Sequence, residues 1–429
     1  MPVDTMQFDI LVIGAGPAGM SAAQVAAQSG ARVGIVDDNI HPGGQIWRQG
    51  PSHPPVGPAR ALLDALARHS NLVLLSGTRV AQALAGKRLQ VEDAEHGHVL
   101  GYDRLILATG ARERFLPYPG WTLPGVTGAG GLQALVKGGT PLAGQRIVLA
   151  GSGPLLWAAA KTAREQGAQI AAIVEQAAPR SVAHFARSLV WTPAKLAQAI
   201  RLRLGLWSTP YWRGAHVAAA HGDDRLRGVT IERPGGSIEL SCDRLACAYG
   251  LLPNIELAAA LGCLSAPYAD TTAIQVDAWQ HTSQPDIYAA GECTGVGGME
   301  LSALEGRIAA HAALGRQDAA RRLFAQRERY RNFSRRLHAA FALNPSLRAL
   351  PKDDTIFCRC EDVAHGQLAQ HDSWRMAKLH TRCGMGPCQG RICGGAAAFC
   401  FGWQPSNTRP PLSPTRIGTL ADLAGKDAA

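Results

Sequence analysis

Apolar runs separated by glycine turns organise the first part of the chain. Phe8 to Ile13 is a continuous apolar run that predicts a buried strand, and an alanine-rich stretch after the next glycines predicts a helix. A second apolar run ends at Asp37. Strand, glycine turn, helix and strand in this order predict a βαβ unit, so we expect an α/β fold.

The turn after the first strand has GxGxxG spacing. In such a turn, the first glycine bends the chain, the second lets a pyrophosphate approach the backbone, and the third lets the helix pack on the strand. Asp37 lies eighteen positions after the last of these glycines, where an acid accepts hydrogen bonds from an adenosine ribose. The predicted dinucleotide-binding residues of this unit are Gly14, Gly16, Pro17, Ala18, Gly19, Asp37 and Asp38.

A second βαβ unit is predicted from Arg146 to Glu175. Gly151 and Gly153 are present, but Leu156 replaces the third glycine and narrows the space for a pyrophosphate. Two interpretations stay open: a working NAD(P) site, or a retained scaffold that binds no nicotinamide or binds another adenine nucleotide such as ATP.

Three further turns complete the picture: GGQ at 43–45, LILATG at 105–110 and DIYAAGECTG at 286–295. With them, the chain resembles flavoproteins with two dinucleotide-binding domains. The resemblance implies FAD, with the acid of the last turn, here Glu292, on the flavin ribitol. It adds these cofactor-binding residues: Gly44, Gln45, Thr109, Gly110, Gly291 and Glu292.

Redox cysteines of the disulfide reductases of this fold are absent from the expected places. No cysteine follows Asp37 in NIHPGGQIWRQGP, and no CxxC occurs between Arg146 and Leu240. We therefore expect no thioredoxin-reductase or glutathione-reductase activity.

Residues 306–350 change in character. This segment has ten arginines and no lysine, and apolar residues recur at spacings of three, four and seven. The pattern predicts an amphipathic helix with a basic face, which is either solvated or docked on an acidic patch of a partner subunit.

The net charge of +10 changes this picture little, because no nucleic-acid-binding motif accompanies it. We expect no nucleic-acid partner. No uncharged apolar stretch is long enough to span a bilayer, so we expect no integral membrane segment and a soluble, cytoplasmic protein.

Six of the ten cysteines lie between Cys358 and Cys400. Such crowding indicates a metal centre, and four thiolates suit a [2Fe–2S] cluster, with two for each iron. The glycines of TRCGMGPCQGRIC (381–393) supply a loop on which the cysteines can converge. Structural zinc is the alternative, although a CxC pair is less usual for zinc than CxxC.

This region resembles the small [2Fe–2S] domain named after bacterioferritin-associated ferredoxin (BFD), in the version CRCE…TRxGMGxCQGxxC. The resemblance implies that the cluster ligands are Cys358, Cys360, Cys388 and Cys393. Cys383 falls on a variable position of the pattern and is not assigned.

The order of these features resembles that of the FAD-containing α (or B) subunits of heteromeric amino- and imino-acid dehydrogenases. This family includes opine oxidases, D-hydroxyproline dehydrogenase, dye-linked proline dehydrogenase and hydrogen cyanide synthase. The resemblance implies two partners, a glycine-oxidase-like FAD subunit that oxidises the substrate and a small ferredoxin-like [2Fe–2S] subunit. The first-choice substrate is D-hydroxyproline.

The expected architecture is a two-dinucleotide-binding-domain flavoprotein, with the second Rossmann-like domain inserted in the first, followed by a small BFD-like domain. The predicted domains are 1–118 with 246–315 (FAD-binding), 119–245 (second Rossmann-like), 316–350 (arginine-rich helical linker), 351–405 (BFD-like [2Fe–2S]) and 406–429 (C-terminal tail).

The chain offers no convincing catalytic base, because its 14 histidines form no cluster and no His–carboxylate pair lies in a recognisable motif. No catalytic residue is therefore predicted, which favours an electron-relay subunit. Two alternatives are an NAD(P)H-dependent flavin and iron–sulfur reductase acting alone, and a non-enzymatic sensor or scaffold.

Overall fold

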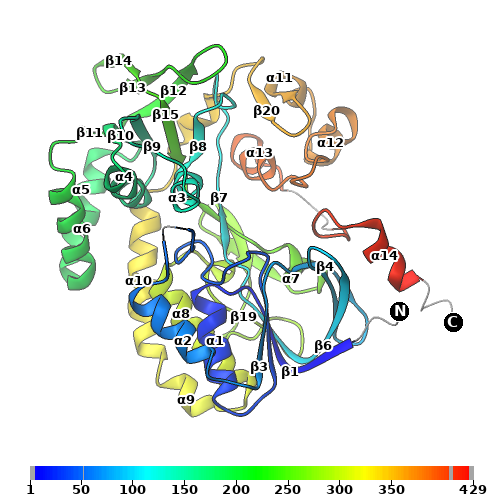
Figure 1. Cartoon of the computed structure of the whole chain (residues 1–429). Coiled ribbons are helices and arrows are strands. Elements are labelled where there is room, and N and C mark those ends of the chain that lie inside the picture. Colours follow the sequence, from blue (N-terminus) through cyan, green and yellow to red (C-terminus); the bar gives the residue numbers. More distant parts are fainter. Residues whose placement is uncertain (1–4, 52, 405–408, 425–429) are drawn as a thin grey trace. The chain divides into compact units, whose positions relative to one another are not determined.

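The computed structural model describes residues 5–51, 53–404 and 409–424. The first residues of the predicted FAD-binding domain, and residues 406–408 and 425–429 of the predicted tail, lie outside this range. The chain forms two compact units (Figure 1). Unit 1 comprises residues 1–112, 252–334 and 407–429, and unit 2 comprises residues 113–251 and 335–406.

Unit 1 is built on a seven-stranded sheet of order β3-β2-β1-β6-β5-β4, with β19 also paired to β6. The strands β1, β2, β3, β6 and β19 run parallel, because helices connect them, whereas β4 and β5 form an antiparallel extension. The strand bounds are β1 Thr5–Ile13, β2 Val33–Val36, β3 Leu72–Leu75, β4 Arg79–Leu84, β5 Arg88–Glu92, β6 Gly97–Leu107 and β19 Ile287–Ala289.

Helices α1 (Pro17–Ala27) and α8 (Met299–Ala313) share one hydrophobic core with this sheet. Both helices are rich in alanine, and a Cβ added to Gly306 of α8 would lie 2.0 Å from the carbonyl oxygen of Ala18. Small residues thus let the two backbones approach closely, which holds the start of α1 against the sheet.

A second core covers the other face of the sheet and includes Phe8, Leu11 and Leu100. The remaining elements of unit 1 are α2 Gly57–Leu66, α7 Glu256–Ala260, β17 Ser265–Tyr268, β18 Thr271–Ile274, the short 3-10 helix η2 Glu292–Thr294, α9 Gln317–Arg321 and α14 Ile417–Ala424.

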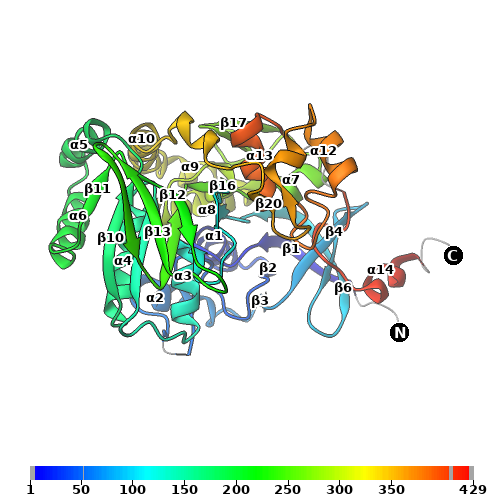
Figure 2. The same cartoon turned by 90° about the horizontal axis from the view of Figure 1, so that it is seen from above.

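Unit 2 contains a five-stranded parallel sheet of order β11-β10-β9-β15-β8. A three-stranded antiparallel sheet of β12, β13 and β14 also belongs to this unit (Figure 2). The strand bounds are β8 Val126–Gly128, β9 Arg146–Gly151, β10 Gln169–Glu175, β11 Tyr211–Arg213, β12 His216–His221, β13 Gly228–Arg233, β14 Gly236–Ser241 and β15 Arg244–Ala248.

Helix α4 follows β9 as the second βαβ pattern predicts, and Leu156 near its start is fully buried. The helices of this part are α3 Ala129–Lys137, α4 Leu155–Glu165, α5 Pro179–Ser188, η1 Leu189–Trp191 and α6 Pro193–Gly205.

The cysteine-rich segment of unit 2 has its own small core, in which Phe357, Leu368 and Trp374 are buried. Short elements surround this core. They are η3 Pro345–Ala349, β20 Ile356–Cys358, β21 Val363–Ala364, α11 His365–Leu368, α12 Trp374–Thr381 and α13 Cys393–Phe401.

Three elements contain boundaries between the units: β7 (Ala111–Glu113), β16 (Leu251–Pro253) and the arginine-rich helix α10 (Phe324–Ala340). Two arginines of α10 are used within unit 1. Arg327 donates to the carbonyl oxygen of Ala278 at 2.6 Å, and Arg331 pairs with buried Glu305 at 2.8 Å. Part of the basic face is therefore engaged inside the chain.

The predicted fold class is confirmed: two Rossmann-like βαβ cores are present, and the second is inserted in the first. No helix among the described residues is long and apolar enough to cross a membrane.

Candidate functional site

The first glycine turn joins β1 to α1 in unit 1. Gly14 has φ +107°, and a Cβ there would lie 2.3 Å from the carbonyl oxygen of Ala108. A Cβ on Gly19 would lie 1.8 Å from the carbonyl oxygen of Gly14, so both positions require glycine for packing. A Cβ on Gly16 meets only the Cα of Gly44, at 3.9 Å. Gly16 is therefore the glycine whose surroundings leave room for a ligand.

Helix α1 begins directly after this glycine, with Gly16 as its N-cap, Pro17 at its first turn and Ala18 next. No side chain caps the helix. The free N–H groups and the helix dipole favour an anion at this end, and a pyrophosphate has the matching charge.

Asp37, at the end of β2, lies against the same turn. One of its carboxylate oxygens accepts from the Ala15 N–H at 2.5 Å, and the other accepts from the Asn39 N–H at 2.8 Å. Asp37 is 6% exposed, whereas the next predicted residue, Asp38, is exposed to solvent. The two carboxylates therefore occupy different environments.

The 43–45 loop also reaches the glycine turn. The Gly43 N–H donates to the carbonyl oxygen of Ala15 at 2.7 Å, and a Cβ on Gly44 would lie 3.0 Å from the Cα of Gly16. Gln45 is exposed, and its side chain accepts from Arg48 at 2.9 Å. The loop thus brings Gly44 against the turn but leaves Gln45 at the surface.

Thr109, Gly110, Gly291 and Glu292 follow β6 and β19, which pair in parallel up to Leu107 and Ala289. The Thr109 hydroxyl donates to the carbonyl oxygen of Asn254 at 2.7 Å, and the Asn254 amide returns a bond to Thr109. Because β1, β2, β6 and β19 run parallel, their carboxyl ends meet at one sheet edge, where a doubly wound fold binds its ligand.

Burial raises the pKa of Glu292, while a hydrogen bond from the Gly298 N–H opposes the shift. A polar cofactor group at this carboxylate would replace part of the hydration that burial removes.

Glu305 is a residue of this site that sequence reasoning missed. It is 2% exposed, and its carboxylate accepts from the Gly291 N–H and the Thr294 hydroxyl, both at 3.2 Å. Arg331 completes the set. The only sequence signal was an acid inside an otherwise apolar helix.

The second glycine turn, in unit 2, is covered by the chain itself. The Ser152 hydroxyl donates to the carbonyl oxygen of Phe341 at 2.8 Å, and a Cβ on Gly153 would lie 3.7 Å from Cγ of Phe341. The Gln176 side chain binds the backbone of Ala342 and Asn344. Residues 341–344 therefore lie over the turn where a nicotinamide dinucleotide would place its pyrophosphate, and we call them the covering segment.

The terminal acid of this unit, Glu175, is fully buried. Its carboxylate accepts from the Gly153 N–H at 2.7 Å and from the Ala177 N–H at 2.8 Å. Burial raises its pKa to about 7. Beside the covering segment, a groove of about 420 Å³ contains Arg180, His184 and Arg336 among its lining residues.

The four predicted cluster ligands line one cavity in unit 2. This cavity has a volume of about 120 Å³ and is lined by Cys358, Cys360, Cys388, Cys393, Phe115, Trp121, Arg359 and Ile392. The aromatic wall is tied to the cysteine segment, since the Trp121 indole N–H donates to the carbonyl oxygen of Ile356 at 2.5 Å.

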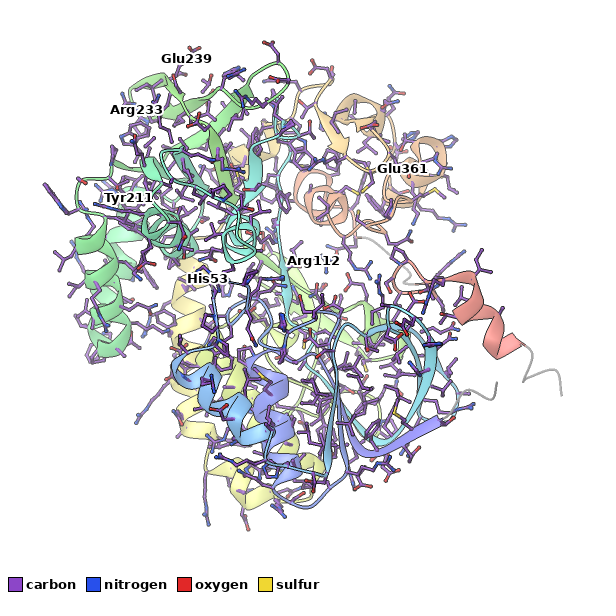
Figure 3. The ribbon with its side chains drawn as sticks, viewed as in Figure 1. His53, Arg112, Tyr211, Arg233, Glu239 and Glu361 are labelled. Atoms are coloured by element: carbon purple, nitrogen blue, oxygen red, sulfur yellow. The ribbon has the colours of Figure 1, made fainter. Side chains whose placement is uncertain are left out.

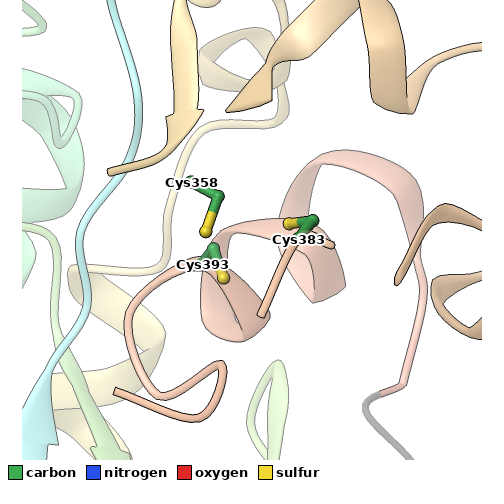
Figure 4. Close-up of side chains that lie close together, drawn as sticks. All are labelled: Cys358, Cys383 and Cys393. Atoms are coloured by element: carbon green, nitrogen blue, oxygen red, sulfur yellow. The ribbon is translucent and has the colours of Figure 1, made fainter. Parts of the chain in front are cut away.

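The structure also brings the unassigned Cys383 to this centre (Figure 4). The sulfur atoms of Cys358, Cys383 and Cys393 all lie within 4.8 Å of one another. The Gly384 N–H donates to the Cys358 sulfur at 3.5 Å. At the rim, Glu361, labelled in Figure 3, accepts from Arg382 at 2.8 Å.

Hydrogen bonds from the Cys383 and Cys393 thiols and from the Gly384 N–H lower the pKa of Cys358 well below its usual range. Cys388 is likewise shifted down, first by the Cys393 thiol. Thiolates are the form that binds metal, so these cysteines are prepared as ligands.

Known proteins support these assignments. Residues 8–314 match the pyridine nucleotide-disulphide oxidoreductase family. An opine oxidase subunit of Rhizobium meliloti (strain 1021) is 33% identical over 97% of this chain and 99% of its own length. The hydrogen cyanide synthase subunit HcnB of Pseudomonas aeruginosa is 32% identical over 90% of this chain and 91% of its own length.

Among solved structures, the L-proline dehydrogenase of P. horikoshii superimposes with a TM-score of 0.67 at 18% identity, over 98% of this chain and 80% of that chain. Thioredoxin reductase of T. acidophilum gives a TM-score of 0.52 at 22% identity, over 75% and 98%. These two likenesses concern the fold. The chain therefore belongs to the pyridine nucleotide-disulphide oxidoreductase family, in the group of FAD-binding oxidoreductase subunits that includes HcnB and its opine oxidase counterpart.

Proposed function

We propose that this chain is the electron-transferring FAD and [2Fe–2S] subunit of a heteromeric dehydrogenase that oxidises an amino or imino acid. The observation that carries the proposal is the combination of an FAD-type turn in unit 1 with a cavity in unit 2 that is lined by four cysteines. Relatives named as subunits of an opine oxidase and of hydrogen cyanide synthase support the heteromeric part.

In unit 1, the open backbone at Gly16 and the helix start at Pro17 and Ala18 would hold the FAD pyrophosphate. Asp37 would turn a carboxylate oxygen to the adenosine ribose, and Glu292 would face the ribitol. Gly44, Gln45, Thr109, Gly110 and Gly291 complete the proposed set, with Gly14, Gly19 and Asp38 from the same turns.

In unit 2, Cys358, Cys360, Cys388 and Cys393 would hold the cluster, and residues 351–405 would form the BFD-like domain. The four sulfur donors around one small cavity fit the ligand demand of a [2Fe–2S] centre. Together, FAD and cluster would supply two-electron and one-electron chemistry. Structural zinc on the same thiolates is the competing outcome.

The substrate would be oxidised on a separate glycine-oxidase-like FAD subunit, and a small ferredoxin-like subunit would complete the complex. D-hydroxyproline is our first choice of substrate, then opines, then glycine. This ranking rests on family resemblance.

The covering segment favours the relay over an NAD(P)H-dependent reductase acting alone. Phe341 and Ser152 occupy the position where a nicotinamide dinucleotide would cross the second turn, and Glu175 is bonded to the turn itself.

The test uses anaerobically purified full-length chain, analysed for FAD, iron, acid-labile sulfide and zinc. We expect FAD and a [2Fe–2S] cluster, no oxidation of D-hydroxyproline by this chain alone, and dye-linked turnover after co-expression with a glycine-oxidase-like subunit. Turnover of an amino acid by the pure single chain would refute the relay.

Titration with NADH and with ATP forms the second arm. We expect NADH to leave the long-wavelength flavin absorbance unchanged, because the second turn is covered. Bleaching of the flavin by NADH would support the stand-alone reductase instead, and zinc without iron would exclude the cluster.

A further inference from the structure

The cysteine centre has more thiols than a [2Fe–2S] cluster uses. A cluster of this type takes four thiolates, two on each iron. Five cysteines meet here, because Cys383 joins the four that line the cavity. The fifth thiol therefore needs an explanation.

The thiols of the cavity fall into two close pairs. The sulfur atoms of Cys358 and Cys393 lie within 4.8 Å of each other, and the thiols of Cys360 and Cys388 are hydrogen-bonded. Since each iron takes two thiolates, these pairs indicate which cysteines would share an iron.

Cys383 stands behind the first pair only. Its sulfur lies within 4.8 Å of those of Cys358 and Cys393, and its side chain is fully buried, whereas Cys360 is exposed. Cys383 does not line the cavity.

The backbone explains why the side chain of Cys383 points inward. Helix α12 ends at Arg382, which has φ +66°, and Gly384 follows with φ +78°. This left-handed turn reverses the chain around Cys383, and its N–H donates to the Thr381 hydroxyl at 3.2 Å. Gly384 packs on Trp374, which is buried, so the turn has a fixed place.

We infer that Cys383 is a reserve ligand for the iron held by Cys358 and Cys393. If either of these residues is lost as a ligand, the Cys383 sulfur binds the iron in its place. Its thiol proton passes to solvent, one iron–sulfur bond replaces another, and no oxidation state changes. The pair Cys360 and Cys388 has no such reserve.

This inference rests on the proposed cluster, and the experiment separates the two. Iron, acid-labile sulfide and the electron paramagnetic resonance spectrum of the reduced cluster are measured in full-length wild type and in Cys393→Ala, Cys388→Ala and Cys393→Ala/Cys383→Ala. Cys393→Ala/Cys400→Ala is the matched control, since half-buried Cys400 belongs to neither pair. FAD content, which depends on unit 1, reports folding.

We expect Cys393→Ala and its Cys400 control to keep most of the cluster with a shifted spectrum. The double variant without Cys383 should lose the cluster, and Cys388→Ala should lose it despite Cys383. Equal loss in Cys393→Ala and the Cys383 double variant, with FAD retained, would overturn the reserve ligand alone. Wild type that contains zinc and no iron would overturn both the cluster and the reserve ligand.

Discussion

The three glycines of the first turn differ in what surrounds them. Gly14 and Gly19 meet backbone oxygens at distances that no side chain tolerates, so they maintain the fold of the turn. Gly16 has extended backbone, with φ −79°, and meets nothing closer than 3.9 Å. A residue at this position is therefore tolerated by the fold but not by a bound pyrophosphate.

Replacing Gly16 with valine tests this distinction. We expect Gly16→Val to fold but to purify without FAD, because the branched side chain occupies the approach of the pyrophosphate to the start of α1. The measurement is the FAD-to-protein ratio by absorbance, with circular dichroism as the check on folding.

Gly205→Val is the matched control, because a Cβ there meets nothing within 4 Å and the residue lies at the end of α6, away from the turn. If Gly16→Val retains the wild-type FAD ratio, the role assigned to this glycine is wrong.

At the scale of elements, the two βαβ units have the same local design with different outcomes. Both end their second strand in an acid that binds the glycine turn, Asp37 at Ala15 and Glu175 at Gly153. In unit 2, the covering segment lies on the turn, and burial keeps the pKa of Glu175 at about 7. The second unit thus carries a buried acid whose ionisation costs stability.

This cost predicts a pH dependence. Below the ordinary carboxyl pKa of 4.5, Glu175 is protonated in both the folded and the unfolded chain, so it costs nothing. As the pH rises toward 7, the unfolded chain ionises first, and stability falls by up to about 3 kcal/mol in total. Above this range the loss remains constant.

We therefore expect Glu175→Gln to flatten this part of the stability profile. The amide replaces one acceptor oxygen at a constant cost, but it does not titrate. Urea unfolding midpoints of wild type and variant, measured between about pH 4 and about pH 8, give the difference in slope. Glu165→Gln, an exposed partner of Lys161, is the control; the same slope in wild type and Glu175→Gln would contradict the prediction.

At the scale of the whole molecule, the last described residues return to the first unit. The Leu412 N–H donates to the carbonyl oxygen of Ala81 at 2.7 Å, and Arg416 binds the buried carboxylate of Glu92 through its backbone N–H at 3.1 Å and its side chain at 3.4 Å. The segment that the sequence suggested as a tail is thus part of unit 1.

We expect Arg416→Ala to lower the stability of unit 1 by about 1–3 kcal/mol, because buried Glu92 loses a charged donor. The thermal midpoint of flavin release measures the effect, and iron content should stay at the wild-type value, since the cysteines belong to unit 2. Arg409→Ala, at an exposed position, is the control. A wild-type midpoint in Arg416→Ala would show that this contact contributes nothing.

The sequence alone determined the features that depend on neighbouring residues. A strand, a glycine turn and a helix lie within thirty residues of each other, so Gly14, Gly16, Gly19 and Asp37 could be recognised from spacing, and the fold class followed. The four cluster cysteines came from a motif of the same local kind.

Tertiary structure decided what depends on distant residues. Phe341 covers a turn that lies far before it in the sequence, Glu305 supports Gly291 from the next helix, and Cys383 reaches Cys358 only because the chain reverses after α12. No spacing rule records such contacts, since long-range packing of the folded chain creates them. The degraded second turn left two interpretations open in the sequence, and the packing of Phe341 favours the one without nicotinamide.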